Sequence, residues 1–287
     1  MLPAVTRFFH PVLPSRELSK GEAVVTLAGR RYGLSRGRSE VGARALGDAP
    51  PARVCERYGY LWLGDEALPA SAEPAIDDEG FEHVGCFGAR FEAPLHVAFD
   101  NFSEDEHTPW VHHFLGWREA DLSRLDFRSE NHPDRTEVRY SAPQRPSVWT
   151  PALLLLPGDH FHNQWVTRFD PVRTVYTLHW FDPKTRRPRP VVSRFAIYFV
   201  PETAGRTWLH TFAMARLEPA SLRFLMPVVR RVVPFLGRNE VGDDARWIPN
   251  VAGTPFSFEG MRLGRFDAPL VHNHHLLETL YWQASMG

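Results

Sequence analysis

Strand-like segments recur along the chain from Phe81 onward, and turn residues separate one segment from the next. In one of them Phe195, Ile197 and Phe199 alternate with residues that would lie on the opposite face, which is typical of a strand. We therefore expect antiparallel strands of one curved sheet. The predicted strands cover residues 83–91, 136–140, 161–168, 174–181, 194–200 and 207–216.

Helical spacing of apolar residues occurs in few places. The clearest run comprises Leu222, Leu225, Met226, Val229 and Val232, and it follows Glu218-Pro219, which we interpret as a start signal. A second helix is expected from about residue 269 to residue 283. Antiparallel strands with a few helices packed to one side predict an α+β fold.

The first third of the chain predicts a small β subdomain, with short strands at residues 23–27, 31–34 and 58–63. A segment rich in Pro, Ala and acidic residues follows and resembles a linker. The predicted organisation is a β subdomain over 1–67, a linker over 68–80 and a larger domain over 81–287.

The charge balance excludes several classes of partner. Lys and Arg number 33 against 34 for Asp and Glu, so nothing favours nucleic acid or an anionic membrane. No apolar run predicts a signal peptide or a membrane span. The two cysteines, Cys55 and Cys86, cannot build a disulfide framework or a four-cysteine cluster. We expect a cytoplasmic protein that acts on a small, largely apolar substrate.

Two histidines, His107 and His112, flank a predicted helix start at Thr108-Pro109. With Thr108 as the N-cap and Pro109 at the first helical position, the two imidazoles occupy the N′ and N4 positions, whose side chains meet. On one continuous helix they would point about 140° apart. The break therefore predicts a shared metal ion. The alternative is a polar surface helix start, and His113 is interpreted as a neighbour of the site.

Asn101, Glu104, His107 and His112 together fill the pattern Asn-x-x-(Asp/Glu)-x-x-His-x4-His. This resembles the iron motif of the Rieske non-heme iron oxygenases, which include aromatic-ring hydroxylases and O- or N-demethylases. The family then has antiparallel strands, a helix and a carboxylate ligand in an acidic patch, here residues 239–247. Asp244 matches the ligand position best, because the apolar Trp247 lies three residues on; Asp243 is the alternative.

The resemblance implies the fold, the cofactor and the activity. It implies a helix-grip catalytic domain (START/Bet v1-like) with a curved antiparallel sheet, beside an N-terminal subdomain that resembles a truncated Rieske domain. It implies Fe(II) held by His107, His112 and Asp244, with Asn101 and Glu104 as further site residues. The implied reaction uses O2 to hydroxylate or demethylate a small apolar or aromatic substrate.

The chain departs from the family at the Rieske cluster. Neither Cys-x-His nor Cys-x-x-His occurs, and the segment between Arg36 and Arg53 lacks both cluster loops. We therefore expect no [2Fe-2S] cluster in this chain. Glu104 stands where the family has an aspartate that links the iron histidines to a neighbouring subunit's cluster, and it could still bond the His107 ring.

A missing cluster predicts a partner. The expected partner is a Rieske-cluster-bearing protein or oxygenase subunit that delivers electrons in trans, within a trimer-based hetero-oligomer. The alternative is a non-catalytic structural or substrate-binding subunit. A further alternative places metal at Asp159-His160-Phe161-His162, as in a cupin strand, although satisfied strand histidines are the simpler interpretation. His272, His274 and His275 are expected at the surface or at an interface.

Overall fold

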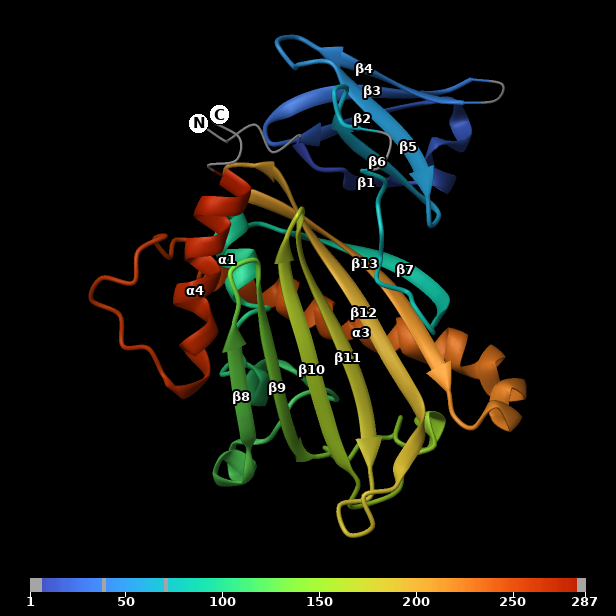
Figure 1. The fold of residues 1–287 in the computed structure, drawn as a ribbon, viewed down its shortest axis with the longest axis vertical. Coiled ribbons are helices and arrows are strands. Elements are labelled where there is room, and N and C mark those ends of the chain that lie inside the picture. Colours follow the sequence, from blue (N-terminus) through green and yellow to red (C-terminus); the bar gives the residue numbers. More distant parts are fainter. Residues whose placement is uncertain (1–6, 38–39, 70–71, 283–287) are drawn as a thin grey trace.

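A seven-stranded antiparallel sheet forms the larger part of the protein, in a computed structural model that describes residues 7–37, 40–69 and 72–282 (Figure 1). Its strand order is β7-β13-β12-β11-β10-β9-β8. All six predicted strands are present. The strands are β7 (Glu82–Phe91), β8 (Asp126–Asn131), β9 (Arg135–Pro143), β10 (His160–Phe169), β11 (Val172–Phe181), β12 (Pro188–Thr203) and β13 (Arg206–Leu217).

Strand β8 was missed by the sequence analysis because it lies at the sheet edge and pairs only with β9. Its sequence, DFRSEN, has a single large apolar residue and is mostly exposed. An edge strand with one neighbour does not need an alternating apolar pattern. Strand β8 therefore forms through its hydrogen bonds to β9, and its own sequence shows no strand pattern.

Helix α3 (Met226–Trp247) packs against β7 and β13, so that a cavity lies between the helix and the sheet. It begins later and ends later than the sequence indicated, because residues 220–225 form a 3-10 helix and α3 continues through the acidic patch. The predicted α+β class is confirmed. The other helices are α1 (Leu95–Asp100), α2 (Thr108–Val111) and α4 (Ala268–Leu276), which continues as a π-helix over Leu277–Trp282.

The N-terminal part contains two three-stranded sheets, β1-β6-β5 and β2-β3-β4. The strand predicted at 58–63 begins at Tyr60, because Tyr58 and Gly59 have φ of 54° and 75° and form the hairpin turn that joins β5 to β6. The strands are β1 (His10–Pro14), β2 (Glu22–Leu27), β3 (Arg30–Arg36), β4 (Val41–Leu46), β5 (Ala52–Arg57) and β6 (Tyr60–Asp65).

Aromatic side chains join the N-terminal sheets to the large sheet. The Trp62 ring stacks on Phe212 of β13 with centroids 5.4 Å apart and meets Tyr198 of β12 edge-on at 5.1 Å. Within the predicted linker, residues 72–80 form no helix or strand, and the carbonyl of Ala75 accepts a hydrogen bond from the Tyr198 hydroxyl. The two parts share a buried contact, and their division into domains stays a prediction.

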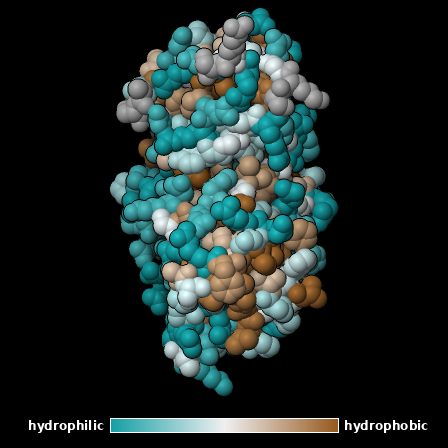
Figure 2. Space-filling model, turned by 90° about the vertical axis from the view of Figure 1, so that its right-hand side faces the viewer, coloured by the Kyte–Doolittle hydropathy of each residue, from teal (hydrophilic) through white to brown (hydrophobic). Residues whose placement is uncertain are grey.

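Apolar side chains gather on part of the surface at the N-terminal end of α3 (Figure 2). Exposed apolar residues of this region include Phe224, Val228 and Phe235, and the Phe235 ring contacts Trp149 with centroids 4.9 Å apart. None of the described helices is both long enough and apolar enough to cross a bilayer.

Two glycines of α3 offer a matched test of how closely the helix approaches the sheet. A Cβ at Gly237 would lie 2.6 Å from Cε1 of Phe195, whereas a Cβ at Gly242 would meet nothing within 4 Å. We expect Gly237→Ala to lower the free energy of unfolding by about 1–3 kcal/mol, because overpacking outweighs the gain in helix propensity.

Gly242→Ala is the control and should raise the free energy of unfolding by about 0.5–1 kcal/mol, since it gains propensity without overlap. Urea unfolding of the two variants measures both values. Equal effects of the two substitutions would contradict the close packing at Gly237.

Candidate metal centre

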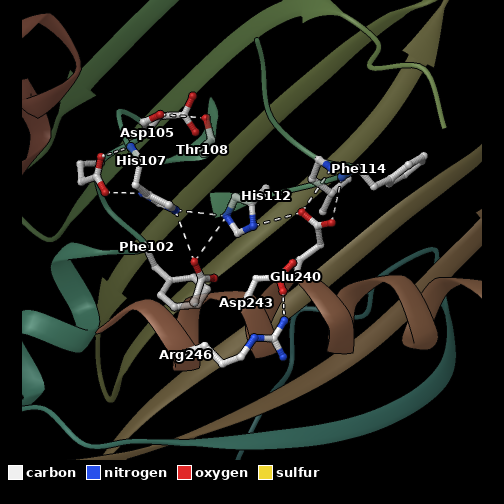
Figure 3. Close-up of polar contacts among 12 residues, drawn as sticks. Phe102, Asp105, His107, Thr108, His112, Phe114, Glu240, Asp243 and Arg246 are labelled. Carbon is white, nitrogen blue, oxygen red and sulfur yellow. Dashed lines mark hydrogen bonds and ion pairs between the residues drawn. The ribbon is translucent and has the colours of Figure 1, made fainter. Parts of the chain in front are cut away.

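His107 and His112 lie at the two ends of the single helical turn α2. The predicted N-cap role of Thr108 is wrong: His107 occupies that position, and the Thr108 hydroxyl donates instead to the carbonyl of Asp105 at 2.9 Å. The helix begins at Thr108 as predicted, and it is a single turn that ends before His112, whose backbone is extended with ψ of 150°. The two imidazoles therefore face each other (Figure 3).

Three ligand atoms from two distant segments meet at this point. Nε2 of His107 lies 3.1 Å from Nε2 of His112, and these atoms lie 3.4 Å and 3.5 Å from Oδ1 of Asp244. Ligands that stand about 2.1 Å from one metal ion and at right angles to each other are about 3.0 Å apart. The three atoms therefore fit one face of the coordination shell of a metal ion. No other described group of three His, Cys, Asp or Glu residues comes together in this way.

The structure also separates Asp244 from its alternative, Asp243. Oδ1 of Asp244 is buried and has no hydrogen-bond partner, although such an atom normally has one. Asp243 points away from the histidines and pairs with Arg246 on the same helix (Figure 3). Of the two carboxylates, only Asp244 is placed to be a ligand, and its orphaned oxygen is the expected sign of a cation site.

Each imidazole has a carboxylate beside its second ring nitrogen. The Nδ1 atom of His107 bonds Glu104, and Nδ1 of His112 lies 3.1 Å from Oε2 of Glu240, at an angle oblique to an ideal hydrogen bond. Glu240 also accepts the backbone N–H groups of Phe114 and Leu115 at 3.1 Å and 3.2 Å. Such partners fix the ring orientation and the tautomer of a metal-binding histidine.

The sequence analysis missed Glu240, although a signal for it existed. Glu240 and Asp244 are four residues apart on α3 and so lie on one face of the helix. That spacing becomes informative only when residues 226–247 are recognised as one helix. In the sequence alone, residues 239–247 resemble an acidic patch beyond a helix.

Arg145 stabilises the segment around α2 through hydrogen bonds to its backbone carbonyls. Its buried guanidinium donates to the carbonyl of Thr108 at 2.7 Å and to the carbonyls of His112 and Trp117. A cation on these carbonyls stabilises the C-terminal end of the turn. Arg145 thereby fixes the backbone that carries His112.

Carboxylates dominate the electrostatics of the site. Burial alone would lower the pKa of His107, but Glu104 and Asp244 outweigh it and raise that pKa to about 10. Burial also opposes the rise in the pKa of His112, which Asp244 and Glu240 cause. Burial would raise the pKa of Asp244, yet the two imidazoles hold it below its usual value. The negative charge of these carboxylates must therefore be balanced, either by protonated imidazole rings or by a bound cation.

The cavity beside these candidate ligands has a volume of about 90 Å³ that the centre of a water molecule can reach. Asn101 and Glu104 line it together with the three candidate ligands, and the Asn101 amide helps to hold the pKa of Asp244 low. The opposite wall is the inner face of the sheet. Its apolar lining includes Phe87, Phe161, Leu178, Phe195 and Ile197, and Phe102 of the turn after α1 also lines the cavity.

The other histidines that the sequence singled out lie outside this group. His113 is exposed. His160 and His162 share one face of β10, as expected, but it is the face opposite Phe161 and the cavity. Nδ1 of His162 lies 2.7 Å from the Ser141 hydroxyl, which agrees with a satisfied strand histidine.

The surface location expected for His274 is wrong. Its Nε2 lies 2.8 Å from Oδ1 of Asp100, and its ring stacks on Phe256 with centroids 4.3 Å apart. The residue is buried because α4 turns this face inward, toward the end of α1. His272 is half-buried and bonds the carbonyl of His132, whereas His275 is exposed.

Comparison with known proteins gives a structural likeness. Neither a protein-family model nor the sequence of a curated protein matches the chain. Dicamba monooxygenase bound to dicamba matches with a TM-score of 0.72 and 16% identity, over 99% of this chain and 100% of that one. Dicamba monooxygenase with non-heme iron and dicamba gives 0.62 and 16%, over 98% of both chains.

A second kind of neighbour is Pseudomonas putida CBB5 NdmA with caffeine, with a TM-score of 0.60 and 13% identity, over 99% of this chain and 93% of that one. These identities are too low to carry an activity across. The likeness shows that the chain shares their fold from the N-terminal sheets to the C-terminal helices.

The ligand assignment predicts metal content. We expect anaerobic reconstitution with Fe(II) to give one iron per chain, and we expect His107→Ala, His112→Ala and Asp244→Ala each to lose most of it. Asp243→Ala and His113→Ala are the controls and should keep their iron, since neither side chain joins the group. Elemental analysis after desalting measures the content, and full occupancy in the three ligand variants would refute the assignment.

Glu240→Gln tests the carboxylate beside His112. We expect this variant to bind Fe(II) about 10–100-fold more weakly, because the charge that orients and polarises the ring is removed. Asp243→Asn, which removes a charge one turn away on the same helix, should leave the affinity unchanged. Competition with a chromogenic chelator measures both affinities, and equal values in the two variants would exclude this role for Glu240.

Proposed function

We propose that this chain is the iron-bearing oxygenase component of a Rieske-type non-heme iron system. It would hydroxylate or demethylate a small, largely apolar or aromatic substrate with O2. The observation that carries the proposal is the meeting of His107, His112 and Asp244 at a buried cavity with an apolar wall. A set of two histidines and one carboxylate suits Fe(II) and leaves coordination positions open, so the bound iron supplies oxygen activation.

The chain's own residues hold and shape the site. His107, His112 and Asp244 are the proposed ligands, while Glu104 and Glu240 orient the two imidazoles. Asn101 lies beside Asp244, where it helps to keep that carboxylate ionised. The phenyl rings of the sheet wall bind the substrate and exclude water, which prevents side reactions at the open positions.

The similar solved structures support this chemistry by analogy. Two of them are described as a monooxygenase with dicamba, one also with non-heme iron, and another holds caffeine. The substrate of this chain is a separate question, because dicamba and caffeine differ from each other in chemistry.

Electrons must reach the iron from outside this chain in our proposal. Inserting one oxygen atom of O2 into a C–H bond, with release of the other as water, consumes two electrons and two protons beyond those of the substrate. Cys55 of β5 and Cys86 of β7 are free thiols, and neither belongs to a described group of possible metal ligands. A Rieske-cluster-bearing partner, in a trimer-based hetero-oligomer of the cytoplasm, would deliver the electrons.

The proposed docking surface surrounds α2. Trp110 lies between the two histidines in sequence and is 69% exposed, while Glu104 is turned inward to His107. A substitution of Glu104 would therefore disturb the metal site as well as docking. Trp110 offers the cleaner test of the partner.

The function is tested by formaldehyde release from a panel of small methoxy- and N-methyl-substituted aromatic compounds. We expect product only when the iron-loaded chain, O2 and a reduced Rieske-cluster protein are all present, and none with Asp244→Ala. Acid-labile sulfide should be absent from the purified chain. Turnover with a generic reductase alone would contradict the need for a partner, and failure to bind iron would favour the non-catalytic alternative.

Trp110→Ala completes this experiment. It should keep its iron and lose most donor-dependent turnover, because the proposed contact with the electron donor is removed. Phe224→Ala removes an aromatic ring that is 72% exposed at the opposite end of α3, and it should behave like the unaltered protein. Equal turnover in the two variants would place the donor elsewhere.

A further inference from the structure

The cavity beside the metal centre has an unbalanced set of charged side chains. Among the described residues that line it there is no Lys or Arg. Four carboxylates line it: Glu104, Asp105, Glu240 and Asp244. The cavity therefore offers no fixed cation to an anionic substrate.

Arg145 is a buried cation that contacts the site, and backbone carbonyls already accept its hydrogen bonds. Its terminal nitrogens donate to the carbonyls of Thr108, His112 and Trp117, and it does not line the cavity. Four carboxylates against one guanidinium and one divalent ion leave a net charge of minus one. No positive charge is left over for a substrate.

The wall opposite the ligands contains polar atoms without partners. Oδ1 of Asn163 and Oγ1 of Thr211 are buried and make no hydrogen bond, and both residues line the cavity. Asn163 is 7% exposed and Thr211 is 0% exposed, so bulk water does not satisfy them. Buried polar atoms of this kind usually have a partner, and an uncharged polar group of a ligand would provide one.

We propose that the cavity selects a neutral aromatic substrate over a carboxylate of the same shape, and that Asn163 and Thr211 receive its polar group. The inference rests on the proposed function and names the substrate class of that site. A carboxylate would lose its hydration among phenyl rings without gaining a Lys or Arg partner, and the four carboxylates of the lining already offset the charge of a bound Fe(II) ion, so its binding is unfavourable. A carboxamide or hydroxyl group loses less hydration and finds hydrogen-bond partners on the sheet wall.

The decisive experiment compares 4-methoxybenzamide with 4-methoxybenzoate, which have nearly the same shape and differ in charge. Calorimetric titration is performed anaerobically on the Fe(II)-loaded chain and on the metal-free chain. We expect the amide to bind at least about tenfold more tightly, a difference of about 1.4 kcal/mol, in both forms. The cavity lining has no Lys or Arg in either form, so the preference should persist without iron. Equal or tighter binding of the benzoate, or no binding of the amide at millimolar concentration, would overturn the proposal.

Two substitutions locate the polar contact. Asn163→Leu and Thr211→Val keep approximate side-chain size, and we expect at least one of them to weaken amide binding about fivefold or more, as loss of one hydrogen bond would. Gln164→Leu changes the neighbouring residue of β10, whose side chain is exposed on the other face, and should have no effect. Unchanged amide binding in both cavity variants, with native melting temperatures, would remove Asn163 and Thr211 from the proposal.

The outcomes separate this inference from the proposed function. Iron content is measured on each sample before titration. A chain that holds iron but binds the benzoate as well as the amide would refute the substrate class and leave the metal assignment intact. A chain that binds no iron but still prefers the amide would refute the proposed function and retain the cavity's selectivity.

Discussion

The contact of the Asp244 carboxylate with two imidazoles is the interaction on which the rest of the structure depends. It joins α3 to the α2 turn and leaves a buried carboxylate oxygen without a hydrogen-bond partner. A buried charge of this kind is costly unless a cation compensates it. Glu104 and Glu240 lie beside the second nitrogens of the two rings and hold the imidazoles against the Asp244 carboxylate. That carboxylate oxygen therefore stays in place without a hydrogen-bond partner. Carboxylate partners on the second ring nitrogens are typical of metal-binding histidines.

The position of α3 sets both the ligand geometry and the shape of the cavity. Gly237 allows the helix to pass close to Phe195 and Phe87, and Gly85 of β7 allows the ring of Pro234 to approach the sheet. A larger side chain at either position would displace the helix. Because Glu240 and Asp244 follow on the same helix, a displacement would move a ligand and its neighbour together. The packing of α3 against the sheet therefore controls the distances among the candidate ligands.

The N-terminal sheets contribute packing to the large sheet, through Trp62 and Tyr60 against Phe212. These contacts lie on the face of β12 and β13 that is opposite the cavity. Cys55 and Cys86 belong to different sheets, and burial raises the pKa of both thiols, so neither is an activated ligand. The group of possible metal ligands among the described residues lies in the larger part of the chain.

The sequence by itself determined the strands with alternating apolar residues, the α+β class and the segment that brings His107 next to His112, because these follow from short-range spacing. It favoured Asp244 as the carboxylate ligand but left Asp243 as an alternative, since the choice depends on the rotation of α3. It did not reveal Arg145, Glu240 or the Asp100–His274 pair, whose partners lie 28 or more residues away in sequence. Only the tertiary structure decided these contacts, because the packing of α3 and α4 sets which side chains face inward, and no local pattern encodes that packing.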